Sequence, residues 1–131
     1  MVKPCYLGIE EKLMDLDCII AFETASDYLG ICKSTHQRPA YYVYSKQNLG
    51  VSEVECTLVE SYTNIEYKEI RGLRVTTPRQ TIVDLITNDR DDQVILESLA
   101  NWYFSHNESF EGLPEDIITP YMEDAISYYD C

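Results

Sequence analysis

Two histidines, His36 and His106, are the side chains of this sequence whose ordinary pKa makes them the first candidates for acid–base chemistry. His36 lies in a polar stretch, residues 34–38, and His106 ends a helical series of apolar residues. Neither setting is typical of a general acid or base, which needs a reacting group within hydrogen-bond reach. We therefore interpret both histidines as capping or surface residues.

A short charged run, Asp89-Arg90-Asp91-Asp92, has the residue types of a cation site. A calcium loop needs about six oxygen ligands at fixed spacing, and no further oxygen ligands accompany this run. Aspartates are also favoured where a helix begins, because the helix dipole is positive there. The run is better explained as a loop followed by a charged helix start.

The cysteines do not form a metal or redox motif, because their spacing is irregular and no Cys-x-x-Cys pair occurs. A Gly-rich phosphate loop, a His-Glu-x-x-His sequence, a nucleophile elbow and EF-hand spacing are also missing. We therefore expect no enzymatic activity, no cofactor, no metal and no small-molecule substrate. Free thiols are expected at all five cysteines: Cys5, Cys18, Cys32, Cys56 and Cys131.

A cluster of bases lies between residues 68 and 79: Lys68, Arg71, Arg74 and Arg79. Beside the start of a helix, the arginines Arg71, Arg74 and Arg79 could hold a phosphate. The alternative is that these bases are solvated hairpin charges or form ion pairs with the acidic C-terminal helices.

The apolar spacing around these residues predicts an α+β fold, with a small, mainly antiparallel sheet flanked by helices. Alternating apolar residues favour strands between Tyr41 and Thr76, with a turn at Arg71-Gly72. Thr77-Pro78 is typical of a helix start. Helical spacing predicts helices over residues 9–17, from about residue 22 to Gly30, from Pro78, from about residue 91 to 106, and from about residue 115 to 129 with a bend or a restart at Pro120.

Trp102 is expected to be largely buried beside Ile82, Leu85 and Leu99, since all four lie on the apolar faces of two consecutive predicted helices. The 131 residues fit one domain, residues 1–131. No apolar run is long enough to span a bilayer, and the N-terminus does not have the pattern of a signal peptide. We expect a cytoplasmic protein that does not act at a membrane.

The net charge of −13 is unevenly distributed, because residues 91–131 contain ten acids and no base. Direct DNA binding is not expected, since phosphate contacts depend on Lys and Arg. The C-terminal helices must bury their apolar faces and turn most carboxylates outward. The predicted partner-binding face consists of Glu108, Glu111, Glu115, Asp116, Glu123 and Asp124, with Asp91, Asp92 and Glu97 nearby.

Two segments resemble the C-terminal domain of AbiEi-type antitoxins, a family of bacterial type IV toxin–antitoxin and abortive-infection systems. The first is the helix Thr24-Ala25-Ser26-Asp27-Tyr28-Leu29-Gly30-Ile31 with the strand opened by Pro39 and Tyr41. The second is Gly72-Leu73-Arg74-Val75-Thr76-Thr77-Pro78-Arg79-Gln80-Thr81-Ile82-Val83-Asp84-Leu85-Ile86. The resemblance covers about residues 20–105, followed by an acidic extension over about residues 106–131.

The resemblance implies an effector-like domain that counters a nucleotidyltransferase toxin without a stable complex, and it implies no catalytic residue. Asp84 would pair with Arg79 or a neighbouring loop. Family members begin with a winged helix that binds their promoter. Fewer than 25 residues precede the matching region here, so we expect the domain without the winged helix and without self-regulation at DNA.

Two functions follow as hypotheses. The first is a non-enzymatic antitoxin-like or phage-defence-related regulator that acts on a basic nucleic-acid-handling protein, such as a toxin nucleotidyltransferase or a nuclease. The alternative is a phage or mobile-element inhibitor, similar to anti-CRISPR proteins and other DNA mimics, whose acidic face blocks a nucleic-acid channel. Acids that serve only solubility are the simpler explanation of the same composition.

Overall fold

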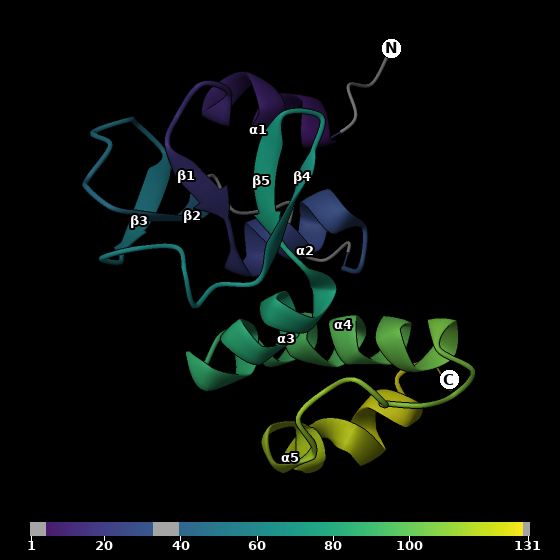
Figure 1. The fold of residues 1–131 in the computed structure, drawn as a ribbon. Coiled ribbons are helices and arrows are strands. Elements are labelled where there is room, and N and C mark those ends of the chain that lie inside the picture. Colours follow the sequence, from purple (N-terminus) through teal and green to yellow (C-terminus); the bar gives the residue numbers. More distant parts are fainter. Residues whose placement is uncertain (1–4, 33–39, 130–131) are drawn as a thin grey trace.

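The computed structural model describes residues 5–32 and 40–129 and confirms the α+β class (Figure 1). Within these residues, a sheet of five short strands has the order β3-β2-β1-β5-β4, and five helices pack around it and beneath it. The elements follow the chain as α1 (Cys5–Leu13), β1 (Cys18–Ile20), α2 (Phe22–Leu29), β2 (Tyr41–Ser45), β3 (Val54–Leu58), β4 (Tyr67–Ile70), β5 (Leu73–Thr76), α3 (Pro78–Thr87), α4 (Asp92–Ser105) and α5 (Glu115–Ile126).

The sheet is mixed, with two antiparallel and two parallel pairs of strands. β1 pairs antiparallel with β2, and β4 pairs antiparallel with β5. β3 runs parallel to β2, and β5 runs parallel to β1. The sequence predicts strands only between Tyr41 and Thr76, but the sheet begins earlier in the chain. The apolar run Cys18–Ile20 forms its central strand, β1.

The β4–β5 hairpin turns at Arg71-Gly72, as the sequence predicts. Both residues have positive φ, 49° and 83°, which a two-residue type I′ turn requires. The turn fixes the register in which Ile70 pairs with Leu73. The arginines of the sequence cluster are thereby placed on a tight hairpin and on the helix that follows it.

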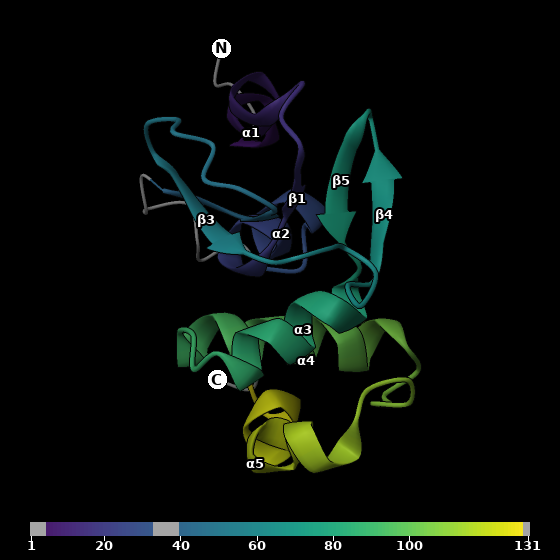
Figure 2. The same ribbon diagram turned by 60° about the vertical axis from the view of Figure 1, so that its left-hand side comes forward.

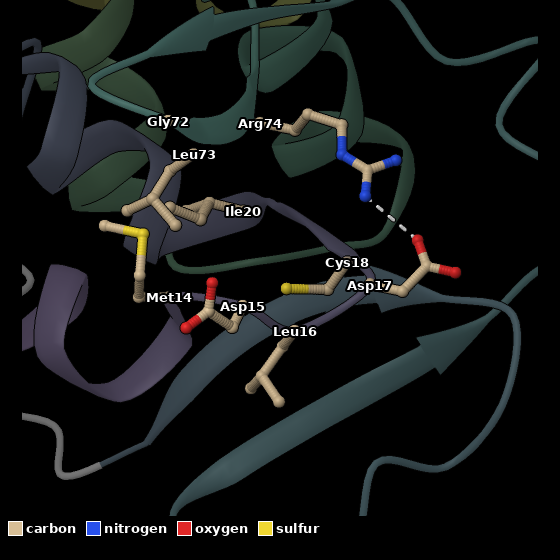
Figure 3. A pocket seen from close by; sticks show the side chains of 9 residues that line it. All are labelled: Met14, Asp15, Leu16, Asp17, Cys18, Ile20, Gly72, Leu73 and Arg74. Atoms are coloured by element: carbon tan, nitrogen blue, oxygen red, sulfur yellow. Dashed lines mark hydrogen bonds and ion pairs between the residues drawn. The ribbon is translucent and has the colours of Figure 1, made fainter.

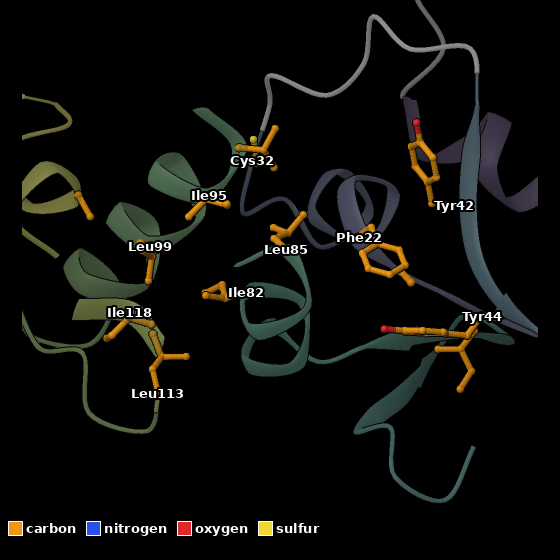
Figure 4. Close-up of a cluster of buried hydrophobic side chains, with 14 of the residues drawn as sticks. Phe22, Cys32, Tyr42, Tyr44, Ile82, Leu85, Ile95, Leu99, Leu113 and Ile118 are labelled. Carbon is orange, nitrogen blue, oxygen red and sulfur yellow. The ribbon is translucent and has the colours of Figure 1, made fainter. Parts of the chain in front are cut away.

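Two apolar clusters hold the fold together. One packs α1 and α2 against one face of the sheet, and Leu13, Ile20 and Val75 are at its buried centre. The other continues from Phe22 of α2 and from Tyr42 and Tyr44 of β2 into the helices below (Figure 4). Its further members include the helical residues Ile82, Leu85, Ile95, Leu99 and Ile118 and, from the connection before α5, Leu113. This second cluster is the core that fixes the C-terminal helices.

The predicted helix starts are confirmed, whereas α1 lies four residues nearer the N-terminus than expected. Thr77 caps α3: its side chain accepts a hydrogen bond from the Gln80 amide, and Pro78 stands in the first turn. Gly30 ends α2 in the left-handed conformation with φ 77°. α5 is a single helix with Pro120 inside it.

The C-terminal helices form successive layers away from the sheet (Figure 2). α3 packs on α2 and α4, and α5 packs mainly on α4 with a smaller contact to α3. Trp102 is only partly buried, against the prediction of a largely buried side chain, although it packs on the cluster that contains Ile82, Leu85 and Leu99. No helix among the described residues is long and apolar enough to cross a bilayer.

Candidate acidic interface

The candidate interface is built on α4, α5 and the connection between them. Asp91 caps the start of α4, with its Oδ1 atom 2.8 Å from the Gln93 amide nitrogen. At the other end, His106 is the C-cap, and its Nδ1 lies 2.7 Å from the carbonyl oxygen of Trp102. Both residues therefore do what the sequence predicts: the aspartate run begins a helix, and His106 caps one.

The connection leaves α4 through two consecutive residues in the left-handed region, Asn107 (φ 57°) and Glu108 (φ 56°). Asparagine tolerates this conformation, but glutamate pays about 1 kcal/mol or more for it. The chain then turns back at Gly112 (φ 99°), which faces the Trp102 ring. These turns bring the connection alongside α4 and onto the start of α5 (Figure 1).

All six carboxylates of the predicted face are exposed to solvent: Glu108, Glu111, Glu115, Asp116, Glu123 and Asp124. Asp91 and Asp92 are also exposed, at the start of α4. Glu97 does not belong with them, because it is only 8% exposed and lies within reach of the Tyr128 hydroxyl, 3.3 Å away. It lies on the inner side of α4, where that helix packs on its neighbours.

The six exposed carboxylates are not neutralised by neighbouring bases. In residues 5–32 and 40–129, none of them forms an ion pair with Lys or Arg. Glu115 and Asp116 lie in the first turn of α5, where the helix dipole favours negative charge. Glu123 and Asp124 lie in the last turn, where it disfavours negative charge, and that turn holds no base.

An apolar groove, which the sequence reasoning missed, lies within this acidic region. Its volume is about 350 Å³, and it lies between the end of α4, the connection and α5. Glu108, Glu111 and Glu115 belong to its lining, together with the apolar side chains Tyr103, Phe110, Leu113, Ile118, Met122 and Ile126. The signal was present in the sequence, because Ile118, Met122 and Ile126 repeat at a spacing of four along α5.

The arginines of the basic cluster pair with carboxylates of the N-terminal and central parts of the chain. Arg71 Nε lies 2.7 Å from Glu10 Oε2, Arg74 Nη2 lies 3.0 Å from Asp17 Oδ1, and Arg79 bonds to Glu66. The hydrogen bond from Arg71 lowers the pKa of Glu10, and those from Arg79 and Thr77 lower the pKa of Glu66. Of the sequence-based alternatives, ion pairing is therefore observed for these three arginines, but with Glu10, Asp17 and Glu66 instead of the C-terminal acids.

Two further sequence-based predictions concern Asp84 and a phosphate site. Asp84 does not pair with Arg79; its Oδ1 accepts a hydrogen bond from Gln80 Nε2 at 2.8 Å. The phosphate site at Arg71, Arg74 and Arg79 stays a prediction.

A second cavity, of about 310 Å³, opens beside the Arg74–Asp17 ion pair, and Cys18 lines it (Figure 3). Burial raises the pKa of the Cys18 thiol to about 11. A thiol with such a pKa is protonated at neutral pH and is a poor nucleophile. Cys18 is therefore not a candidate nucleophile at neutral pH.

The other candidate chemistry of the sequence is accounted for within the described part of the chain. Cys18 and Cys56 are free thiols, and no three His, Cys, Asp or Glu side chains in this part gather as a metal site. Arg90 of the charged run pairs with Glu23. His36, Cys131 and the side chain of Cys5 lie outside the described residues.

No model of a known protein family matches the chain. No curated protein sequence matches it either.

Proposed function

We propose that this chain is a non-enzymatic, cytoplasmic binding protein, antitoxin-like or related to phage defence, that acts on a basic nucleic-acid-handling protein. Its binding surface is the acidic face of Glu108, Glu111, Glu115, Asp116, Glu123 and Asp124. The partner is a toxin nucleotidyltransferase or a nuclease. The resemblance of residues 20–105 to AbiEi-type antitoxins supports the biological setting, and the exposed carboxylates support the mode of binding.

The observation that carries the proposal is the placement of Glu123 and Asp124. An exposed carboxylate in the last turn of a helix costs about 0.3–1 kcal/mol through the helix dipole. A base in that turn would offset the cost, and α5 has none there. Solubility needs charge but not charge at a position that weakens the helix, so these two acids are better explained by a binding partner.

The chemistry of the partner follows from the sign of the face. Proteins that handle nucleic acids carry Lys and Arg surfaces that replace the counterions of phosphates. A face of unpaired carboxylates attracts such a surface over a Debye length of about 8 Å at physiological salt. Attraction of this kind raises the association rate and falls steeply as salt increases.

A second candidate is a DNA-mimic inhibitor that uses the same face. The pairs Glu115-Asp116 and Glu123-Asp124 are eight residues apart, about 12 Å along a helix. That distance equals the axial rise of roughly three to four phosphates along one DNA strand. An inhibitor of this class would compete directly with DNA for its target, whereas an antitoxin-like regulator need not.

The test expresses a toxin nucleotidyltransferase together with this protein in a growth-rescue assay. The variant E115K/D116K/E123K/D124K reverses four charges, and its two pairs affect the α5 dipole in opposite senses, so the helix is retained. The control variant, E53K/E55K/E60K/E69K, makes the same change in net charge at exposed residues around β3 and β4.

The proposal expects the α5 variant to lose rescue and the control variant to keep it. Where a complex can be measured, its association rate should fall steeply between about 50 and 500 mM salt. Rescue and binding by the α5 variant at the wild-type level would overturn the proposal and leave the acids with a role in solubility. Competition of the wild-type protein by duplex DNA for the target would favour the DNA-mimic alternative.

A further inference from the structure

We infer that the groove between α4 and α5 docks a basic amphipathic segment of the partner, with an apolar side chain in the groove and Lys or Arg against its acidic members. This inference rests on the proposed function and assigns its contact point. The groove holds about 350 Å³, at the small end of ligand pockets, which suits an anchoring side chain. Glu108, Glu111 and Glu115 contribute the charge around it.

The apolar surface continues beyond the groove. Phe110 and Tyr103 in the groove have ring centroids 4.7 Å apart, and Tyr103 contacts Phe104 at 5.1 Å. Phe104 in turn lies 6.2 Å from Tyr129. Phe104 and Tyr129 are 45% and 52% exposed, so this row of rings reaches from a concave site onto open surface, where aromatic residues are typical of protein interfaces.

A peptide segment fits these features better than the other occupants. A second copy of this chain would bring another net charge of −13 against the same carboxylates, which repel it. A small molecule would fill the groove but leave the exposed rings of Phe104 and Tyr129 uncovered. A segment with spaced apolar residues and flanking bases covers both parts, as amphipathic helices do in other grooves.

The experiment uses a fluorescein-labelled peptide of about 12 residues in which a phenylalanine and a leucine, four positions apart, are flanked by lysines. Fluorescence anisotropy measures its binding to the full-length protein. E108K/E111K reverses two charges at the groove, and E123K/D124K reverses two charges of the same face outside the groove lining. The two variants have the same net charge, so a general electrostatic effect is equal in both.

We expect the groove pair to weaken peptide binding by at least about tenfold and the α5 pair by less than about threefold. Two further variants each replace one exposed apolar side chain with serine. Ile126→Ser, at a groove residue that is 39% exposed, should weaken binding, whereas Leu58→Ser, on β3 and 60% exposed, should not. A peptide with glutamate in place of lysine should not bind.

The outcomes separate this inference from the proposed function. Equal weakening by the two charge pairs, with no effect of Ile126→Ser, would overturn the groove as the docking site while the acidic face stands. Retained binding in all variants would overturn both. Loss of binding in the groove variants alone, with unchanged thermal unfolding, supports the inference.

Discussion

We expect the replacement of Arg90 to lower the free energy of unfolding more than the replacement of any other charged residue where the helices meet the sheet. It lies between α3 and α4, and its guanidinium reaches back to α2, where Nη2 lies 2.7 Å and Nε 2.9 Å from Oε1 of Glu23. The same group lies 4.4 Å from the ring centroid of Tyr42 and 4.9 Å from that of Phe22. One side chain thereby joins the helical layer to α2 and β2.

The loss of stability expected for Arg90→Met can be estimated from the burial of the Arg90–Glu23 ion pair. Breaking a fully buried ion pair costs about 3–5 kcal/mol, because the remaining charge is left without a partner. The side chain of Glu23 is 6% exposed and that of Arg90 is 24% exposed, so water reaches the arginine end and the lower value applies. Methionine keeps part of the contact with the rings. We expect a loss of about 3 kcal/mol in the free energy of unfolding.

Urea unfolding at neutral pH, followed by circular dichroism and by the fluorescence of the single tryptophan, measures this loss. The variant E23M/R90M removes both charges and should recover most of the stability, to within about 1 kcal/mol of the wild type. The double-mutant cycle then gives the coupling between the two residues. A double variant no more stable than Arg90→Met would refute the argument that an unpaired Glu23 causes the loss.

Three further predictions concern the cap, the turn and the buried aspartate. Thr77→Ala removes the cap of the Gln80 amide and should cost about 1 kcal/mol, measured by urea unfolding. Gly112→Ala should cost about 2 kcal/mol in thermal unfolding, since φ is 99° and a Cβ would lie 3.1 Å from the Trp102 ring. Burial raises the pKa of Asp84, so the folded protein loses stability as pH rises from about 3.9 through the raised value. Asp84→Asn carries no charge and should lack this decline, so that it gains on the wild type over that window.

Matched substitutions control these three measurements. Thr87→Ala near the end of the same helix removes an exposed hydroxyl that bonds only to the Val83 carbonyl and to the adjacent Asn88 side chain, and it should change stability by less than about 0.5 kcal/mol. Gly30→Ala tests positive φ without crowding, because nothing lies within 4 Å of its Cβ position, and should cost about 1 kcal/mol. A stability difference between Asp84→Asn and the wild type that is independent of pH would contradict the burial argument.

Local signals in the sequence were sufficient where one residue type decides the structure. Thr77 and Pro78 predict a helix start, Gly30 predicts a helix end, and Gly72 predicts a turn, because caps and positive φ depend on adjacent residues. The strand at Cys18–Ile20 was missed because three apolar residues have no readable period. Its central position depends on pairing with β2 and β5, which are distant in the chain.

The parallel pairing of β2 and β3 was also beyond the sequence. Parallel strands usually need a crossover of about a dozen residues or more. Residues 46–53 are shorter than that, so local reasoning favours a hairpin. The pairing in which Tyr41 faces Val54 and Ser45 faces Leu58 is part of the tertiary structure, in which β2 also pairs with β1 and packs on α2.

For the acidic face, too, some features could be predicted from the sequence and others could not. Exposure of Glu115, Asp116, Glu123 and Asp124 was predictable, because a helix that buries Ile118 and Ala125 must turn its charged residues outward. Glu97 was assigned to the wrong side, since α4 is apolar on most of its surface and its period leaves that position ambiguous. The groove could not be predicted, because it depends on the path of the connection at Glu108 and Gly112. The composition of a loop does not specify such a path.

The layered stacking of the helices separates two kinds of evolutionary constraint. α5 is the outermost layer and packs mainly on α4, with β1 and β5 beyond α3 and α2 (Figure 2). Substitutions on the outer side of α5 therefore alter the surface without disturbing strand pairing. In evolution, the outer residues of α5 can change while the residues that pair the strands stay the same.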